Sequence, residues 1–360
     1  MTSPFPTSKA YGVTTSNTVR AAIELGHDCS ILAPLGKSSV DSRENIFPIK
    51  GWLFNKANML YRWKASGKIA FNLIRFVAVF KCIRHIWKFK PNIVWNRDLF
   101  SSFLILLFKP KTTIIICEIH RINSISEKVI IRFMLRKKTV VLAPIREGMI
   151  QSDYVHKFNF IVSGMAVNKS FLDLGSIKDL SRPEVLNLVY VGRPYSSNQK
   201  LNVDFIKDLA KVIHLNSLNW KIYVVGIPKE FFISESSIIV VENLPHDLIP
   251  ELLQNMDVGL VIYPELEYFK QSFPIKIVEY AAMNLFILAS RTESHEKILG
   301  ADKAIYYEPD NVEDCYNKIR MLDSDWKNYG LLRQNARTWA EGKSYKERVS
   351  NLLIEVQTRQ

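Results

Sequence analysis

Short apolar runs alternate with amphipathic segments along most of the chain. The most apolar runs, such as 112–118 (TTIIICE) and 220–226 (WKIYVVG), are rich in β-branched residues, which is typical of buried parallel strands. Between such runs, segments such as 201–214 and 312–322 carry apolar residues at helical spacing. Strands and helices that alternate in this way predict an α/β fold with parallel sheets.

The alternation fills two halves of similar size, and 360 residues exceed the ~250–300 at which single cores stop growing. We therefore predict two Rossmann-like, doubly wound domains that face each other across a cleft. The N-terminal domain covers 1–170, the C-terminal domain covers 171–345 and begins with a linker at 171–185, and a final helix at 346–360 is expected near the domain junction. In such sheets ligands bind beyond the carboxyl ends of the strands.

The chain starts close to its first predicted helix, 14–25, which a strand at 29–33 follows. The strand that should open this βαβ unit would have to precede Pro4, where only residues 1–3 remain. We expect either a stub of a first strand or, as we favour, further sequence upstream of an incomplete N-terminus.

Cysteine usage and the apolar segments bear on the compartment. The four cysteines lie far apart and show no disulfide, redox or metal-ligand spacing, which predicts reduced thiols in the cytoplasm. No signal peptide is predicted at 1–9, and the most apolar stretches are too short, or too interrupted by cations, to span a bilayer. No Asp/Glu/His cluster has metal-ligand spacing, so neither a metal nor another cofactor is predicted.

The net charge of +13 is unevenly distributed. Residues 1–180 carry 27 Lys and Arg against 11 Asp and Glu, whereas 181–360 carry 21 against 24. Such a basic field favours an anionic partner: a nucleic acid, a membrane surface or a phosphorylated ligand. Segment 56–90 mixes cations with aromatic residues and shows no nucleic-acid-binding module, so we expect an anionic membrane surface and no nucleic acid. The alternative is a solvated face above a buried aromatic stripe.

Two predicted strand-to-helix loops of the second half carry candidate binding residues. Gly192, which permits a close backbone approach, is followed by Arg193 and Lys200, a fork-shaped and a point cation suited to a diphosphate. Gly226 ends the next strand and leaves room for a ligand. The alternative for the two cations is an ordinary pair on the surface.

Segment 271–290 joins a helix start to a strand. Ser272 and Pro274 are expected to open the helix, whose free N–H groups would bind a phosphate or sugar oxygen. Glu279, one turn further on, could accept two hydrogen bonds from a vicinal diol such as a ribose. An ordinary α/β unit with a solvated glutamate gives the same pattern.

In the first half, two residues are placed to face a ligand. Gly12 lies in a loop that we expect before a helix N-terminus. His120 follows a predicted strand in the sequence Glu118-Ile119-His120, where it could contact a reacting sugar or transfer a proton, although a lone histidine is more often structural. No role is assigned to the histidines at 27, 85, 156, 214 and 295.

Taken in order, these segments resemble the glycosyltransferases of family 4, which have the two-domain GT-B fold. The resemblance covers nearly the whole chain. Its motifs are AYGVTT…LGHD at the start, EIH at 118–120, SGMAVNKSF at 163–171, YVGR followed by Lys200, ENLPHDLIPELLQNMDVGLVIY at 242–263 and SFPIKIVEYAA at 272–282. That family transfers a sugar from a nucleotide donor with retention of configuration and without a metal.

The resemblance implies a role for each candidate. Arg193 and Lys200 would hold the donor diphosphate, Glu279 the nucleotide ribose, and His120 the transferred sugar. The backbone amides of Phe273, Pro274 and Ile275 are assigned to the donor sugar and phosphate as one segment. Two departures stand out: Gln271 occupies the place of a usual glutamate, and a single glycine, Gly12, stands where a pair is common.

We therefore expect a retaining glycosyltransferase of cell-surface polysaccharide synthesis, with a nucleotide-sugar donor and a saccharide or lipid-linked saccharide acceptor. It would lie in the cytoplasm, peripherally on the inner membrane face. The alternatives are a sugar-nucleotide epimerase of the same fold and a catalytically weak scaffold partner of another glycosyltransferase.

Overall fold

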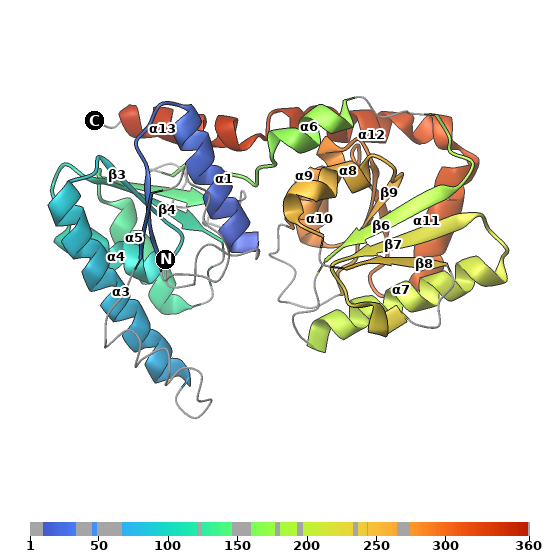
Figure 1. The fold of residues 1–360 in the computed structure, drawn as a ribbon, viewed down its shortest axis with the longest axis horizontal. Coiled ribbons are helices and arrows are strands. Elements are labelled where there is room, and N and C mark those ends of the chain that lie inside the picture. Colours follow the sequence, from blue (N-terminus) through green and yellow to red (C-terminus); the bar gives the residue numbers. More distant parts are fainter. Residues whose placement is uncertain are drawn as a thin grey trace. The chain divides into compact units, whose positions relative to one another are not determined.

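The computed structural model of the chain (Figure 1) describes residues 10–33, 45–48, 67–120, 122, 124–145, 160–176, 181–192, 197–232, 237–242, 244–264 and 274–358. The chain forms two compact units, Met1–Gly164 with Tyr345–Gln360, and Met165–Ser344. In both, the pairings between the described strands are parallel. The predicted α/β fold with parallel sheets is therefore confirmed.

The first unit contains a three-stranded and a two-stranded parallel sheet. In the three-stranded sheet, β3 (Ile93–Asn96), β4 (Ile114–Ile119) and β5 (Val140–Pro144) lie in that order, with β4 at the centre. In the two-stranded sheet, β1 (Ser30–Ala33) pairs with β2 (Asn45–Pro48). All residues of β4 are buried, which accounts for its run of isoleucines.

Helices cover both faces of the three-stranded sheet. They are α1 (Ala10–Glu24), α3 (Gly67–Phe89), α4 (Leu99–Phe108), α5 (Ile125–Leu135) and α13 (Tyr345–Gln357). α3, α4 and α5 pack on one face through residues such as Val79, Ile105 and Met134. α13 packs on the other face through Leu352 and Val356, with α1 beside it (Figure 1). The last helix of the chain is thus part of the core of the first unit.

The second unit contains a six-stranded parallel sheet. Its strands are β6 (Leu186–Val191), β7 (Trp220–Val225), β8 (Ile238–Val241), β9 (Val258–Val261), β10 (Phe286–Ser290) and β11 (Ile305–Tyr307). Their order is β11-β10-β9-β6-β7-β8. The chain first builds outward from β6 to β8 and then returns to the other side of β6, so the strand order reverses between β6 and β9. In open α/β sheets, ligands bind at the carboxyl ends of the strands at such a reversal.

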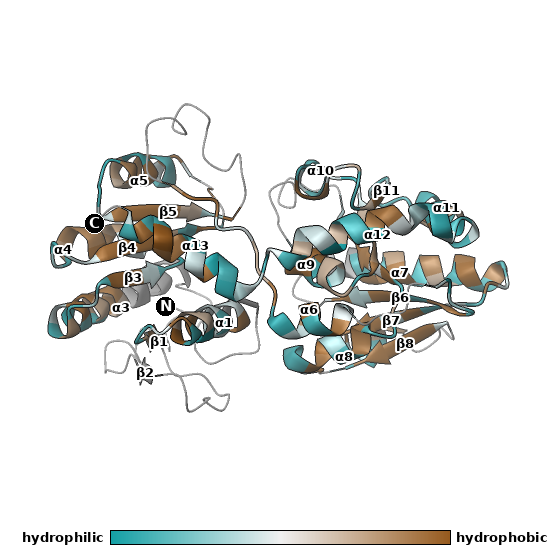
Figure 2. Cartoon of the chain, turned by 90° about the horizontal axis from the view of Figure 1, so that it is seen from above, coloured by the Kyte–Doolittle hydropathy of each residue, from teal (hydrophilic) through white to brown (hydrophobic). Residues whose placement is uncertain are grey.

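Two apolar layers enclose this sheet (Figure 2). The helices are α6 (Lys169–Gly175), α7 (Ser197–Leu215), α8 (Ile249–Leu253), α9 (Ile275–Ala282), α10 (Glu293–Leu299), α11 (Val312–Ser324) and α12 (Trp326–Glu341), with short 3-10 turns η3 (Lys229–Phe232) and η4 (His246–Leu248). α7 and α11 contribute to the layer on one face, while α6, α8, α9 and α12 contribute to the other. Asn284 follows the C-cap of α9, Met283, and its φ of 57° lies in the left-handed region that asparagine tolerates.

The observed elements differ from the sequence expectations in two places. The start of the expected linker at 171–185 belongs to α6, because the ring of Phe171 is fully buried in the apolar layer. α9 begins at Ile275, not at Ser272, because Pro274 is extended at ψ 127°.

The part of segment 56–90 that precedes Gly67 lies outside the described residues. Within the described part of the chain, no helix is both long enough and apolar enough to cross a bilayer.

Candidate functional site

The strand-order reversal of the second unit is tied to α9 by one tyrosine. Tyr280 is fully buried, and its hydroxyl oxygen accepts a hydrogen bond from Val191 N at 2.9 Å, at the end of β6. Its ring lies on β9, where a Cβ added at Gly259 would come within 2.3 Å of the ring. Gly259 therefore lets α9 approach β9 closely, and the hydrogen bond between Tyr280 and Val191 ties the helix to the carboxyl end of β6.

Glu279 of α9 is a buried carboxylate with a histidine partner. Its residue is 3% exposed, and its Oε1 lies 2.7 Å from Nε2 of His246 in η4. The His246 ring packs 5.5 Å from that of Phe171 in α6. Two helices and a turn from separate parts of the unit thus hold the Glu279 side chain in one orientation.

Sequence reasoning did not single out His246. The available signal was its place: it opens η4 after Pro245, past the carboxyl end of β8, on the same edge of the sheet as the other candidates.

The glycines predicted for this edge are where a ligand could approach. Gly192 follows β6, and a Cβ there would meet the ring of Tyr190 at 2.6 Å. Gly226 follows β7 with φ of 84°, a conformation that other residues rarely adopt. Both positions therefore require glycine for a local reason, whatever ligand binds.

The remaining predicted residues of this edge are placed less completely. Pro274 is the N-cap of α9 and Ile275 its first residue. Lys200 lies in the first turn of α7. Arg193, Gln271, Ser272 and Phe273 lie outside the described residues.

Gly12 lies in a different element from the one predicted. It is in the first turn of α1, which begins at Ala10, and not in a loop before a helix. Glycine has a low helix propensity, but Gly12 is buried in a helix that packs beside α13, and tertiary packing overrides propensity.

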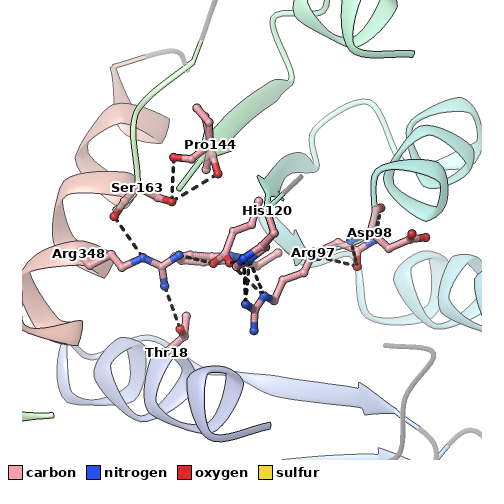
Figure 3. A network of polar contacts seen from close by, with 11 residues as sticks. Thr18, Arg97, Asp98, His120, Pro144, Ser163 and Arg348 are labelled. Atoms are coloured by element: carbon pink, nitrogen blue, oxygen red, sulfur yellow. Dashed lines mark hydrogen bonds and ion pairs between the residues drawn. The ribbon is translucent and has the colours of Figure 1, made fainter. Parts of the chain in front are cut away.

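A network of polar contacts surrounds Glu118 at the carboxyl end of β4 in the first unit (Figure 3). The residue is 2% exposed. Oε1 accepts hydrogen bonds from Trp95 Nε1 at 2.7 Å and from Arg348 Nη2 at 2.6 Å. Oε2 lies 3.2 Å from Arg97 Nε and 3.1 Å from His120 Nε2.

Arg348 brings α13 into this network. Its guanidinium also donates to the carbonyl oxygen of Ser163 at 3.2 Å and to Thr18 Oγ1 of α1 at 3.4 Å (Figure 3). Burial alone would raise the pKa of Glu118, but Arg348, the hydrogen bond with His120 and the charge of Arg97 hold that pKa well below its ordinary value. The Glu118 carboxylate is therefore ionised, and hydrogen bonds and ion pairs with protein groups take the place of water around it.

His120, the predicted catalytic histidine, faces both Glu118 and Arg97. Its Nε2 lies 3.0 Å from Arg97 Nε, so this nitrogen cannot accept from Arg97 and donate to Glu118 at once. Burial lowers the pKa of His120, the bond with Glu118 opposes that shift and Arg97 adds to it, which keeps the imidazole neutral at neutral pH. The network thus controls which imidazole nitrogen holds the proton.

The sequence signalled part of this network. The motif Glu118-Ile119-His120 was visible in the sequence, whereas the contact of Trp95 and Arg97 with Glu118 depends on the pairing of β3 with β4. Arg348 lies 230 residues from Glu118 and carries no signal in its local sequence. Among the described residues, no group of three or more side chains is arranged to hold a metal ion.

Comparisons with known proteins place the fold. The solved structures that match include a glycosyltransferase from Rickettsia africae, with 17% identity and a TM-score of 0.70 over 99% of this chain and 97% of that one. Sucrose-phosphate synthase from Thermosynechococcus elongatus has 11% identity and a TM-score of 0.68 over 97% and 93%. Anabaena HepE in complex with UDP and glucose has 11% identity and a TM-score of 0.62 over 99% and 98%. The chain therefore has the GT-B fold.

A sequence comparison matches most of the second unit to a family model. Residues 186–325 match the family model described as "Glycosyl transferases group 1". No curated protein matches the chain. The matched range contains β6, β9 and α9, and hence the strand-order reversal, Glu279 and His246.

Proposed function

We propose that this protein is a glycosyltransferase that takes a sugar from a nucleotide-sugar donor. The observation that carries the proposal is the buried Glu279–His246 pair at the carboxyl edge of the second unit, within the range that matches the group 1 glycosyltransferases. With Oε1 held by His246, Oε2 of Glu279 would accept hydrogen bonds from the ribose hydroxyls. HepE, a solved structure of the same fold, is described as a complex with UDP and glucose.

The leaving diphosphate would be stabilised by Arg193, Lys200 and the amides at the start of α9. Negative charge grows on this group as the bond to the anomeric carbon breaks. Fixed donors in such a site can each lower a barrier by ~2.7–4 kcal/mol. We propose retention of configuration and no metal, with Gln271, a neutral amide in place of a carboxylate, bonding to a sugar hydroxyl.

In the first unit, His120 would contact the transferred sugar. Its neutral imidazole and the bond to Glu118 would present one defined nitrogen to a hydroxyl group. The acceptor that we propose is a saccharide or lipid-linked saccharide of a cell-surface polysaccharide.

The first unit would also bind an anionic membrane surface from the cytoplasmic side. Aromatic side chains of α3 and α4 are exposed in the described structure: Phe80 by 59%, Trp87 by 54% and Phe108 by 50%. Trp87 Nε1 donates to the carbonyl of Phe108 at 2.6 Å, which joins the two helices into one surface. Cations near such a surface contribute about 1 kcal/mol each on an anionic bilayer. Flotation with anionic vesicles at physiological salt tests this, and recovery of all protein in the unbound fraction would contradict it.

A thermal-shift panel of nucleotide sugars, with UDP- and GDP-linked donors first, tests the proposed donor. Only a ligand that binds the native state raises Tm, so a cognate donor should do so in a concentration-dependent way. Glu279→Gln should reduce that shift. Incubation with the stabilising donor alone then separates transferases from epimerases: slow hydrolysis supports the proposal, and formation of an epimer would replace it with the alternative.

A further inference from the structure

Lys276 is a cation in a place where the helix itself disfavours one. It lies in the first turn of α9, which has no acidic residue there. The N-terminus of a helix carries partial positive charge, so carboxylates stabilise this position and ammonium groups destabilise it. The N-cap is Pro274, which has no side-chain acceptor and makes no capping hydrogen bond. Positive charge is therefore concentrated at this helix end, and among the described residues no acidic side chain of the first turn offsets it.

Two aromatic rings hold the Lys276 ammonium in place. Nζ lies 4.1 Å from the centroid of the Tyr190 ring and 5.8 Å from that of the Tyr263 ring. A cation over aromatic faces is stabilised without losing its charge. Among the described residues, no carboxylate lies within ion-pair distance of this ammonium.

Burial and a hydrogen bond from Asn202 fix the Tyr190 side chain. The residue is 3% exposed, and its hydroxyl oxygen accepts a hydrogen bond from Asn202 Nδ2 at 3.0 Å, a nitrogen that also donates to Ile262 O at 3.3 Å. One asparagine of α7 thus joins the ends of β6 and β9. We call the rings of Tyr190 and Tyr263 the aromatic seat of Lys276, and this link holds the seat in place before a ligand binds.

The seat lies at the strand-order reversal. Tyr190 is the penultimate residue of β6, and Tyr263 comes two residues after β9 ends. These are the adjacent strands between which the order reverses, where ligands of open α/β sheets bind. A fixed ammonium and an uncapped helix N-terminus at this point both favour an anion with several oxygens, and a diphosphate has them.

We infer that Lys276 binds the diphosphate of the nucleotide-sugar donor, in addition to the proposed Arg193 and Lys200, which follow β6 in the sequence. The inference rests on the proposed function. Lys276 would neutralise charge that grows on the leaving group, and the tyrosine rings would keep its ammonium from folding away into solvent.

Titration calorimetry with UDP, GDP and ADP tests the inference on the full chain, followed by the free nucleoside of whichever diphosphate binds. Lys276→Met should weaken binding of the nucleoside diphosphate about tenfold or more, as expected when a charged hydrogen-bond donor is lost. The weak binding of the nucleoside should be unchanged. Lys276→Arg should recover part of the affinity, because it restores the charge.

Lys211→Met is the matched control, because Lys211 pairs with Asp208 on the exposed side of α7 and its loss removes the same charge. It should leave the affinity unchanged. The Tm of ligand-free Lys276→Met should stay close to that of the parent protein, since relief of the unfavourable position offsets the lost ring contacts.

Unchanged diphosphate affinity in Lys276→Met, together with a large fall in Tm, would assign Lys276 a purely structural role and overturn the inference. If the parent protein binds none of the three diphosphates and no nucleotide sugar, the proposed function itself fails. The two failures are therefore distinguishable.

Discussion

In the first unit, the carboxylate of Glu118 is surrounded by the donors of Trp95, Arg97 and Arg348, whereas in the second unit the ammonium of Lys276 lies over two tyrosine rings. Both groups lie at the carboxyl edge of a parallel sheet. The first is compensated within the protein and fixes structure around it. The second is compensated by no described carboxylate, which is the state expected of a group that awaits an anionic ligand.

The strongest test of this contrast removes the partner of the compensated charge. Arg348→Met would leave Glu118 buried without its closest cation, and breaking a buried pair in this way costs about 3–5 kcal/mol of unfolding free energy. Urea unfolding measures the loss. The double variant Arg348→Met with Glu118→Gln should recover part of it, because no unpaired charge is then buried. A loss below about 1 kcal/mol in the single variant would mean that Glu118 does not depend on Arg348.

A second test measures how the free energy of unfolding depends on acidic pH, to which the buried His295 of the second unit responds. Burial, with the bond to Ser290 O opposing and Lys276 adding, lowers the pKa of His295 to about 4. A histidine in the unfolded chain titrates near 6.5, so the unfolded state binds the proton first. Stability should therefore be full above about pH 6.5 and fall by about 3 kcal/mol as the pH drops towards 4.

In the parent protein, Nδ1 of His295 donates a hydrogen bond to Ser290 O at 2.8 Å. The variant His295→Asn keeps a donor for this oxygen and removes the imidazole that titrates. Unfolding free energies across this pH range should therefore slope less in the variant. Equal slopes in the two proteins would show that His295 does not titrate as described. Glu118 adds its own loss as the pH falls through and below the ordinary carboxyl pKa of about 4.5, because the unfolded state then binds a proton that the native state, with its lowered Glu118 pKa, does not bind.

Gly259→Ala is a smaller perturbation of the same edge. The added methyl group would meet the Tyr280 ring at 2.3 Å, and overpacking of this kind costs about 1–3 kcal/mol. Because Tyr280 bonds to Val191 N, we also expect weaker nucleotide binding. Chemical denaturation and titration calorimetry measure the two effects. Unchanged stability would show that α9 can shift without cost.

The sequence predicted the fold and the residue types of the sites better than their contacts. β-branched runs such as that of β4 identified the strands, because a strand buried on both faces must be apolar throughout. The partners of those residues depended on packing between distant segments: His246 meets Glu279, and Arg348 meets Glu118. Local patterns carry no information on such contacts. Gly12 was wrongly assigned to a loop because propensity was weighed without the packing of α1 beside α13.

The most direct test of the central claim is release of the nucleoside diphosphate from a nucleotide sugar, measured for the parent protein, Glu279→Gln and the control Lys211→Met. We predict that the parent and the control turn over the donor that stabilises the protein, and that Glu279→Gln loses about tenfold or more in kcat/KM, as expected for a lost hydrogen bond to a charged group. Equal turnover by the parent protein and Glu279→Gln would contradict the account, because the Glu279–His246 pair would then have no part in donor binding.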